Sequence, residues 1–117
     1  MTAHRAALVA LAAPALALVL AAPAPAAAED AAKIFAKSCS PCHGKEGEPS
    51  AVFAKQGVRS FKDQAWQKAA PDAQIEKSIR EGKKGTLMAS FEKQLTAGEI
   101  TALVAHIRKL GGVADEK

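Results

Sequence analysis

Apolar residues in the second half of the chain recur at the spacing of an α-helix, without the alternation typical of a strand. The clearest stretch follows Thr96, which together with Glu99 forms the sequence signature of a capping box. Gly111 and Gly112 come directly after Leu110, the last apolar residue of this pattern, and indicate the end of the helix. The pattern predicts a helix over residues 96–110 whose buried face is made of Ile100, Leu103, Val104, Ile107 and Leu110.

Three further helices are predicted before this one. Asp30 is expected to cap the first, which runs to about Ser38. Apolar residues between positions 61 and 69 indicate a short second helix. Asp72 is expected to cap a third helix, which ends at Gly82. With few β-branched residues and no strand pattern, the chain is predicted to be all-α, with three to four helices.

The first 28 residues have the order of a secretory signal peptide. Arg5 precedes an apolar run of 15 residues (6–20), and three alanines stand just before Glu29. A membrane-spanning helix needs about 20 apolar residues, so cleavage before Glu29 is favoured, and a retained anchor is the alternative. We therefore predict a signal peptide over residues 1–28 and one exported domain over residues 29–117, with no membrane span after cleavage.

The predicted mature domain is small. Its 89 residues include only five aromatic side chains, and small domains often depend on a metal, a disulfide or a cofactor. It keeps 15 basic and 12 acidic residues, and a net charge of +3 is too weak to indicate a nucleic-acid-binding protein. Lys45, Lys83 and Lys84 are candidates for orienting it on an acidic protein partner, or are ordinary solvated surface.

The stretch Cys39-Ser40-Pro41-Cys42-His43 carries the most specific chemistry in the chain. Two cysteines three positions apart, followed directly by histidine, are typical of a c-type haem attachment site. The two thiols would bond to the haem vinyl groups, and His43 would bind the iron from the proximal side. A disulfide or a zinc site is the alternative, although zinc needs four ligands and the other cysteine and histidine spacings do not suit it.

Met88 is the candidate for the second axial ligand. It is the only methionine after residue 28 and lies in the loop between the third and last predicted helices. A loop can bring the thioether over the open side of a haem, and packing within the loop is the alternative. His106 is the competing ligand, but its position between Leu103 and Ile107 favours a role in helix packing.

These features together resemble a small class I c-type cytochrome, a monohaem soluble bacterial electron carrier. The resemblance covers residues 30–112 and rests on a helix leading into the motif, a later segment with the methionine, and a capped closing helix. The residues that carry it in the first two parts are Cys39, Cys42, His43, Gly44, Ile79, Gly82, Lys83, Met88 and Phe91.

The resemblance implies the small cytochrome c fold, with helices wrapped around one covalently attached haem c per chain. It implies that Cys39 and Cys42 hold the haem and that His43 and Met88 bind its iron. It also implies that the first and last helices cross, and that Ala31 and Phe35 face the side of the last helix holding Leu103 and His106.

The chain departs from the family pattern at a few positions. Ala89 stands where proline usually follows the methionine, and His106 stands where an aromatic residue is usual. The carbonyl of Pro49 is a nearby candidate for binding the second nitrogen of His43, which would fix the imidazole orientation. The indole of Trp66 is a candidate partner for a haem propionate, with core packing as the alternative.

The resemblance implies a periplasmic protein that carries single electrons between redox proteins and is not an enzyme, with no catalytic residues. Its partners would be a redox donor and acceptor, with a membrane oxidase or reductase among them, and it would act as a monomer. Two alternatives stay open. One is a haem c subunit of a larger respiratory or sulfur-oxidising complex, and the other is a haem-based small-molecule sensor.

Overall fold

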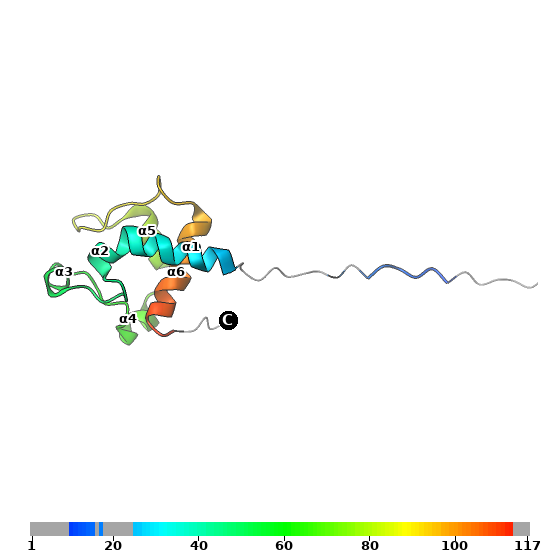
Figure 1. Cartoon of the computed structure of the whole chain (residues 1–117), viewed down its shortest axis with the longest axis horizontal. Coiled ribbons are helices and arrows are strands. Elements are labelled where there is room, and N and C mark those ends of the chain that lie inside the picture. The colour runs from blue at the N-terminus through cyan, green and yellow to red at the C-terminus, as the bar shows by residue number, and fades with distance from the viewer. Residues whose placement is uncertain (1–9, 16, 18–24, 114–117) are drawn as a thin grey trace, which may run out of the picture.

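Every regular element of the described residues is helical. The computed structural model describes residues 10–15, 17 and 25–113 of the 117-residue chain (Figure 1). The elements in chain order are α1 (Pro25–Ile34), the π-helical turn η1 (Phe35–Cys39), α2 (Ser40–His43), α3 (Ala51–Lys55), α4 (Gln64–Ala69), α5 (Asp72–Glu81) and α6 (Ala97–Leu110). The all-α prediction is confirmed for this part of the chain.

The first helix begins earlier than the sequence pattern predicted. Asp30 lies inside α1, which starts at Pro25, so the prediction that Asp30 caps this helix is wrong. Proline suits the first helical position because its missing N–H would have no helical partner, and the alanines after it are strong helix formers. The cleavage site predicted before Glu29 falls within α1 and stays a prediction, as does the signal peptide, of which residues 1–9, 16 and 18–24 lie outside the described residues.

Helices α1, η1 and α2 follow one another without a break and form one rod from Pro25 to His43 (Figure 1). In the π-helical turn the backbone N–H of Ser40 donates to the carbonyl of Phe35, five residues earlier. The carbonyl of Ala36, which an α-helix would pair with that N–H, instead accepts a 2.6 Å hydrogen bond from the Ser40 hydroxyl. The helical turn therefore contains one extra residue, and the Ala36 carbonyl still has a hydrogen-bond partner.

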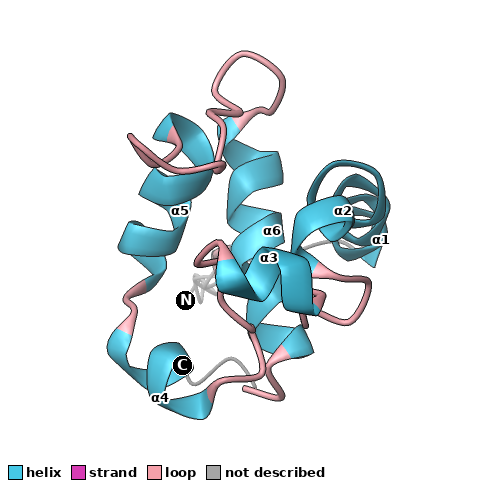
Figure 2. Ribbon diagram, turned by 90° about the vertical axis from the view of Figure 1, so that its left-hand side faces the viewer, coloured by secondary structure: helices cyan, strands magenta, loops and turns pink. Residues whose placement is uncertain are grey.

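Helix α6 lies between α1 and α5 (Figure 2) and provides four of the ten buried apolar residues of the core in the described part of the chain. Where α1 crosses α6, Ala31, Phe35 and Leu103 are all at most 1% exposed. The ring of His106 lies 5.0 Å from that of Phe35, as the resemblance implied for this crossing. The predicted face of α6 is buried apart from the half-buried Leu110. Burial of these apolar side chains is the main stabilising contribution at the crossing.

The helix ends follow local side-chain chemistry. The capping box of α6 is present, since the Thr96 hydroxyl accepts from the Glu99 N–H and the Glu99 carboxylate accepts from the Thr96 N–H, each at 3.1 Å. The predicted cap of α5 is wrong, because Pro71 occupies the cap position and the carboxylate of Asp72 binds Arg108 instead. The predicted short helix over residues 61–69 begins at Gln64, where Asp63 caps it.

Candidate functional site

The cysteine–histidine motif lies at the far end of the helical rod from Pro25. Cys39 is the last residue of η1, while Cys42 and His43 lie in α2. Gly44 ends the rod directly after the histidine, with φ at +77° and its N–H bonded to the Ser40 carbonyl at 2.8 Å. A Cβ at this position would overlap the carbonyl of Glu48, so only glycine fits here. The three candidate haem-binding side chains are thus grouped on the final turns of a rigid element.

Both cysteines are half-buried and are not joined to each other. Burial raises the pKa of Cys39 to about 11, so its thiol is protonated at neutral pH. A reactive thiol needs a lowered pKa, which the surroundings of Cys39 do not provide. No group of three or more histidine, cysteine or acidic side chains suited to a metal ion occurs in residues 10–15, 17 and 25–113. The burial of Cys39 therefore does not favour a reactive thiol at that position.

His43 is half-buried and its ring stacks on that of Phe61. The ring centroids lie 4.6 Å apart and the planes are inclined by 16°. Burial lowers the pKa of His43, which favours the neutral imidazole that binds metals. Its Nδ1 atom is buried without a hydrogen-bond partner, so the Pro49 carbonyl does not bind it. A neutral buried imidazole directly after two thiols fits the donor set of an attached haem.

Met88 lies half-buried in the loop after α5 and packs against the core. Its carbonyl accepts from the Lys83 N–H at 3.0 Å, and its own N–H donates to the Thr86 hydroxyl at 3.2 Å. Gly82 lies beneath this loop with φ at +71°, where a Cβ would lie 2.7 Å from the Met88 carbonyl oxygen. The backbone around the methionine is thus fixed by close packing and short-range hydrogen bonds.

The two other residues with open roles both contact aromatic rings. The pKa of His106 is lowered by burial first and by Lys109 second, with Glu46 acting in the opposite direction. Its place against Phe35 at the helix crossing agrees with the packing role that the sequence favoured. Trp66 lies 5.4 Å from Phe61 and packs against the core, as its packing alternative requires.

Two residues near the site were missed by the sequence reasoning. Gln67 is a buried polar side chain of the core, at 4% exposure, and the side chain of Arg108 is 12% exposed. The Arg108 guanidinium donates to Gln67, to the carbonyl of Ala70 and to Asp72. A glutamine in a short amphipathic helix and an arginine near a helix end are ordinary sequence features, so no local signal identified them.

Comparison with known protein families gives a match over residues 26–107. The family is described as cytochrome C oxidase, cbb3-type, subunit III. The chain belongs to this family. Its cofactor is therefore a covalently bound haem c, which supplies the iron, and its general role is electron transport.

Two curated relatives of this subunit III family member are FixP subunits of cbb3-type cytochrome c oxidase. The protein from Azorhizobium caulinodans is 32% identical over 86 residues, which is 74% of this chain and 28% of the relative. The protein from a Bradyrhizobium species is 31% identical over 83 residues, covering 69% of this chain and 27% of the relative. The chain thus spans less than a third of the length of these relatives.

Solved structures with the same fold are small c-type cytochromes. The KustC0563 c-type cytochrome is 34% identical, with a TM-score of 0.64 over 68% of this chain and 95% of its own. The c-type cytochrome NirC shares the fold at 16% identity, with a TM-score of 0.59 over 74% of this chain and 94% of its own. The family member described here therefore has the small cytochrome c fold that the sequence predicted.

Proposed function

We propose that this chain is a periplasmic single-electron carrier whose haem is attached to Cys39 and Cys42 and ligated by His43 and Met88. The observation that carries the proposal is the neutral, half-buried imidazole of His43, placed directly after two half-buried thiols at the end of a rigid rod. The close packing of the loop around Met88 is evidence for Met88 as the second iron ligand.

Each of these residues would have a separate task. Cys39 and Cys42 would hold the macrocycle at a fixed place, His43 would bind the proximal side of the iron, and Met88 the distal side. The bound haem supplies reversible one-electron chemistry, and a methionine ligand raises its reduction potential relative to two histidines. With His43 and Met88 both binding the iron, the site would be suited to electron transfer and not to binding a substrate.

Export to the periplasm is supported by the sequence of residues 1–28, with their apolar run and alanines before Glu29. In the described ranges no helix combines the length and apolar character that crossing a membrane requires. Mass measurement of the protein recovered from the periplasm tests the boundary, since cleavage before Glu29 leaves a chain of 89 residues plus one haem. A mass that retains residues 1–28 would support the anchored alternative.

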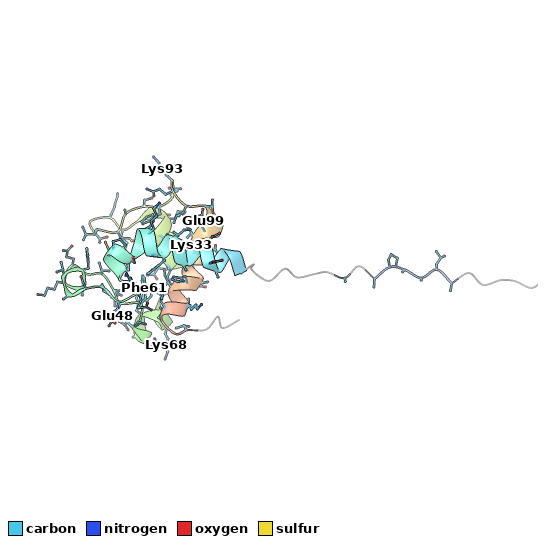
Figure 3. All side chains as sticks on the ribbon, viewed as in Figure 1. Lys33, Glu48, Phe61, Lys68, Lys93 and Glu99 are labelled. Carbon is cyan, nitrogen blue, oxygen red and sulfur yellow. The ribbon has the colours of Figure 1, made fainter. Side chains whose placement is uncertain are left out.

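The proposed partners are a redox donor and acceptor protein, with a membrane oxidase or reductase as one of them. Lys45, Lys83 and Lys84 are exposed and could contact an acidic partner. The labelled lysines Lys68 and Lys93 extend from opposite sides of the folded part, so these two charges do not share one face with each other (Figure 3). We therefore expect salt to slow electron exchange only modestly.

Haem attachment provides the decisive experiment. The wild-type chain and the Cys39→Ala, Cys42→Ala double variant are each expressed with the cytochrome maturation machinery. Acid–organic extraction should leave the haem colour with the wild-type protein and remove it from the variant, because only thioether bonds resist extraction. A wild-type protein that gives up its haem, or that is colourless with a Cys39–Cys42 disulfide, would overturn the proposal.

A permanent place in an oxidase complex is the second candidate function. It is favoured by the FixP relatives, which are oxidase subunits. The match to this chain covers 28% and 27% of their lengths. The native mass of the haem-containing species purified at low salt from cell extracts separates the two. A species of one chain supports the diffusible carrier, whereas a stable assembly with oxidase subunits supports the second candidate.

A further inference from the structure

The last turn of α5 is paired with the segment that follows Met88. Carbonyl groups in the last turn of a helix have no partner within that helix. In α5 the Ile79 carbonyl accepts from the Phe91 N–H at 3.0 Å, and the Arg80 carbonyl accepts from the Glu92 N–H at 3.2 Å. The chain therefore leaves the end of α5, forms the loop that carries Met88, and returns to α5 before it continues to α6 (Figure 1).

Ser90 adds a side-chain bond to this pairing. Its hydroxyl donates to the Arg80 carbonyl at 2.6 Å and accepts from the Glu92 N–H at 3.4 Å. A distance of 2.6 Å is at the short end of the range for hydroxyl–carbonyl bonds. The Arg80 carbonyl has two lone pairs, so it can accept from the Ser90 hydroxyl and the Glu92 N–H together. Ser90 thus ties the returning segment to the end of α5.

The loop is packed closely where it returns. A Cβ at Gly82 would lie 2.7 Å from the Met88 carbonyl oxygen and 2.8 Å from the Ser90 nitrogen. The Lys83 N–H donates to the Met88 carbonyl at 3.0 Å. The backbone of residues 88–90 therefore lies directly against the end of α5. Because Ser90 is only two residues after Met88, movement of Ser90 away from α5 would also move the Met88 backbone.

Ala89, which joins the two residues, provides little restraint of its own. Its side chain is exposed and has no polar group. A proline at this position would fix φ at about −65°, whereas alanine leaves both backbone angles free to change. The position of Met88 relative to α5 therefore depends on the bonds on either side of Ala89, and the bond of the Ser90 hydroxyl is the shortest of those described above.

We propose that Ser90 is a positioning residue for the haem iron, because its bond to Arg80 keeps the loop closed with the Met88 thioether at the distal position. The proposal rests on the assignment of Met88 as the distal ligand under the proposed function. It adds an effect that this assignment does not contain. An added ligand can replace Met88 only when the loop opens, and opening breaks the bond between Ser90 and Arg80. A bond present only in the closed loop lowers the population of the open loop.

The size of the effect follows from the strength of one hydrogen bond. Loss of its net contribution changes an equilibrium about fivefold. The apparent affinity for a ligand is proportional to the fraction of protein that is open to it. Removal of the Ser90 hydroxyl should therefore raise the apparent affinity of the ferric holoprotein for added imidazole about fivefold.

The experiment titrates imidazole into the ferric holoprotein of the wild type, Ser90→Ala, Ser90→Thr and Ser78→Ala. Ser78 is the matched control, since its hydroxyl donates to the Gln74 carbonyl at 3.0 Å within α5, a bond that loop opening does not break. Ser90→Ala should bind imidazole about fivefold more tightly. Ser90→Thr keeps a hydroxyl and should stay near the wild-type affinity, as should Ser78→Ala.

Two results of the titration would overturn the proposal. The first is an equal imidazole affinity for wild type and Ser90→Ala, even with a lower unfolding free energy, because a purely structural residue changes global stability without opening the loop. The second is a Ser90→Thr protein that binds imidazole as tightly as Ser90→Ala, because the hydroxyl would then have no role.

Thermal melting provides a second measurement of loop opening. Ser90 is exposed, so Ser90→Ala removes no buried packing and should leave the helices folded. The absorption band of sulfur bound to ferric iron reports the Met88 bond, and circular dichroism reports the helices. In Ser90→Ala the band should disappear at a temperature further below the helical transition than in the wild type. The same separation in both proteins would overturn the proposal.

Failure of the ligand assignment is recognised separately. A wild-type protein without the sulfur-to-iron band, or a band that survives Met88→Ala, would overturn the proposed ligand set and the inference together. A band that Met88→Ala abolishes, combined with an imidazole affinity that Ser90→Ala does not change, would overturn the inference alone.

Discussion

The Ser40 hydroxyl donates a 2.6 Å hydrogen bond to the carbonyl of Ala36, while the Ser40 N–H donates to the carbonyl of Phe35. This pair of bonds spans the π-helical turn between α1 and the haem motif. An inserted residue of this kind changes the direction in which the following side chains point, and such turns are frequent at functional sites. Ser40 is thus both the residue after Cys39 and the one that pairs the carbonyl displaced by the turn.

Ser40→Ala should destabilise the holoprotein by about 1 kcal/mol, because it leaves the Ala36 carbonyl without its partner. Ser78→Ala is the matched control, since the Ser78 hydroxyl also donates to a carbonyl four residues earlier, Gln74 at 3.0 Å, within regular helix. In this regular helix the Gln74 carbonyl keeps its backbone hydrogen bond when the Ser78 hydroxyl is removed. The unfolding free energy of Ser78→Ala should therefore stay close to the wild-type value. Urea unfolding followed by circular dichroism measures both, and equal losses would contradict the special role of Ser40.

Gly82→Ala should weaken the support of Met88. A Cβ at Gly82 would lie 2.7–2.8 Å from backbone atoms of Met88, Ala89 and Ser90, in addition to the positive φ of +71°. We expect a loss of about 3 kcal/mol or more in unfolding free energy and a weaker absorption band from sulfur bound to ferric iron.

Gly85→Ala is the control for the backbone conformation alone. Gly85 has φ at +75° in the same loop, but a Cβ there would have no atom within 4 Å. Gly85→Ala should lower the unfolding free energy by about 1 kcal/mol and retain the absorption band. If the two alanine variants lose stability equally, the close packing of Gly82 against the Met88 loop has no energetic role.

Met88→Ala should abolish the absorption band that arises from sulfur bound to ferric iron and should lower the reduction potential, because a thioether favours ferrous iron. His106→Phe should keep the band, since His106 packs against Phe35 at the helix crossing. The visible spectrum of the oxidised protein and a redox titration measure both effects. The opposite pattern in the two variants would assign the distal position to His106.

His106 should make stability depend on pH near neutrality. Its folded pKa lies below the ordinary value of 6.5, chiefly because of burial. The unfolded chain therefore binds the proton more readily, and stability is fully present above pH 6.5 and decreases as pH falls through the folded pKa. Unfolding of the wild type and of His106→Phe is compared between pH 7.5 and about 4.5. The variant should lose less stability over this range, and parallel curves would show that His106 does not contribute.

The sequence by itself determined the parts of this protein whose structure depends on residues close together in the chain. The spacing of Ile100, Leu103 and Ile107, together with the capping box at Thr96, was sufficient for α6 because helical period and capping are short-range effects. The haem motif was likewise readable, since attachment requires two thiols and an imidazole within five residues.

Short-range signals also failed where several local solutions compete. The sequence favoured Asp30 as a cap, yet Pro25 and the alanines after it begin the helix earlier. Helix α3 was not predicted, because its five residues carry no amphipathic pattern, with Val52 63% exposed. The π-helical turn at Phe35–Cys39 was also not predicted, because such a turn has no sequence period of its own.

Only the tertiary structure decided how the candidate ligand His43 is held. The contact of Phe61 with His43 joins residues from separate segments, and the bonds of Gln67 to Ile107 and of Arg108 to Gln67 bridge 40 and 41 residues. Each of these side chains has many local partners available in sequence. Their pairing follows from the packing of α4 against the end of α6, which buries the amide and requires every polar atom to find a partner.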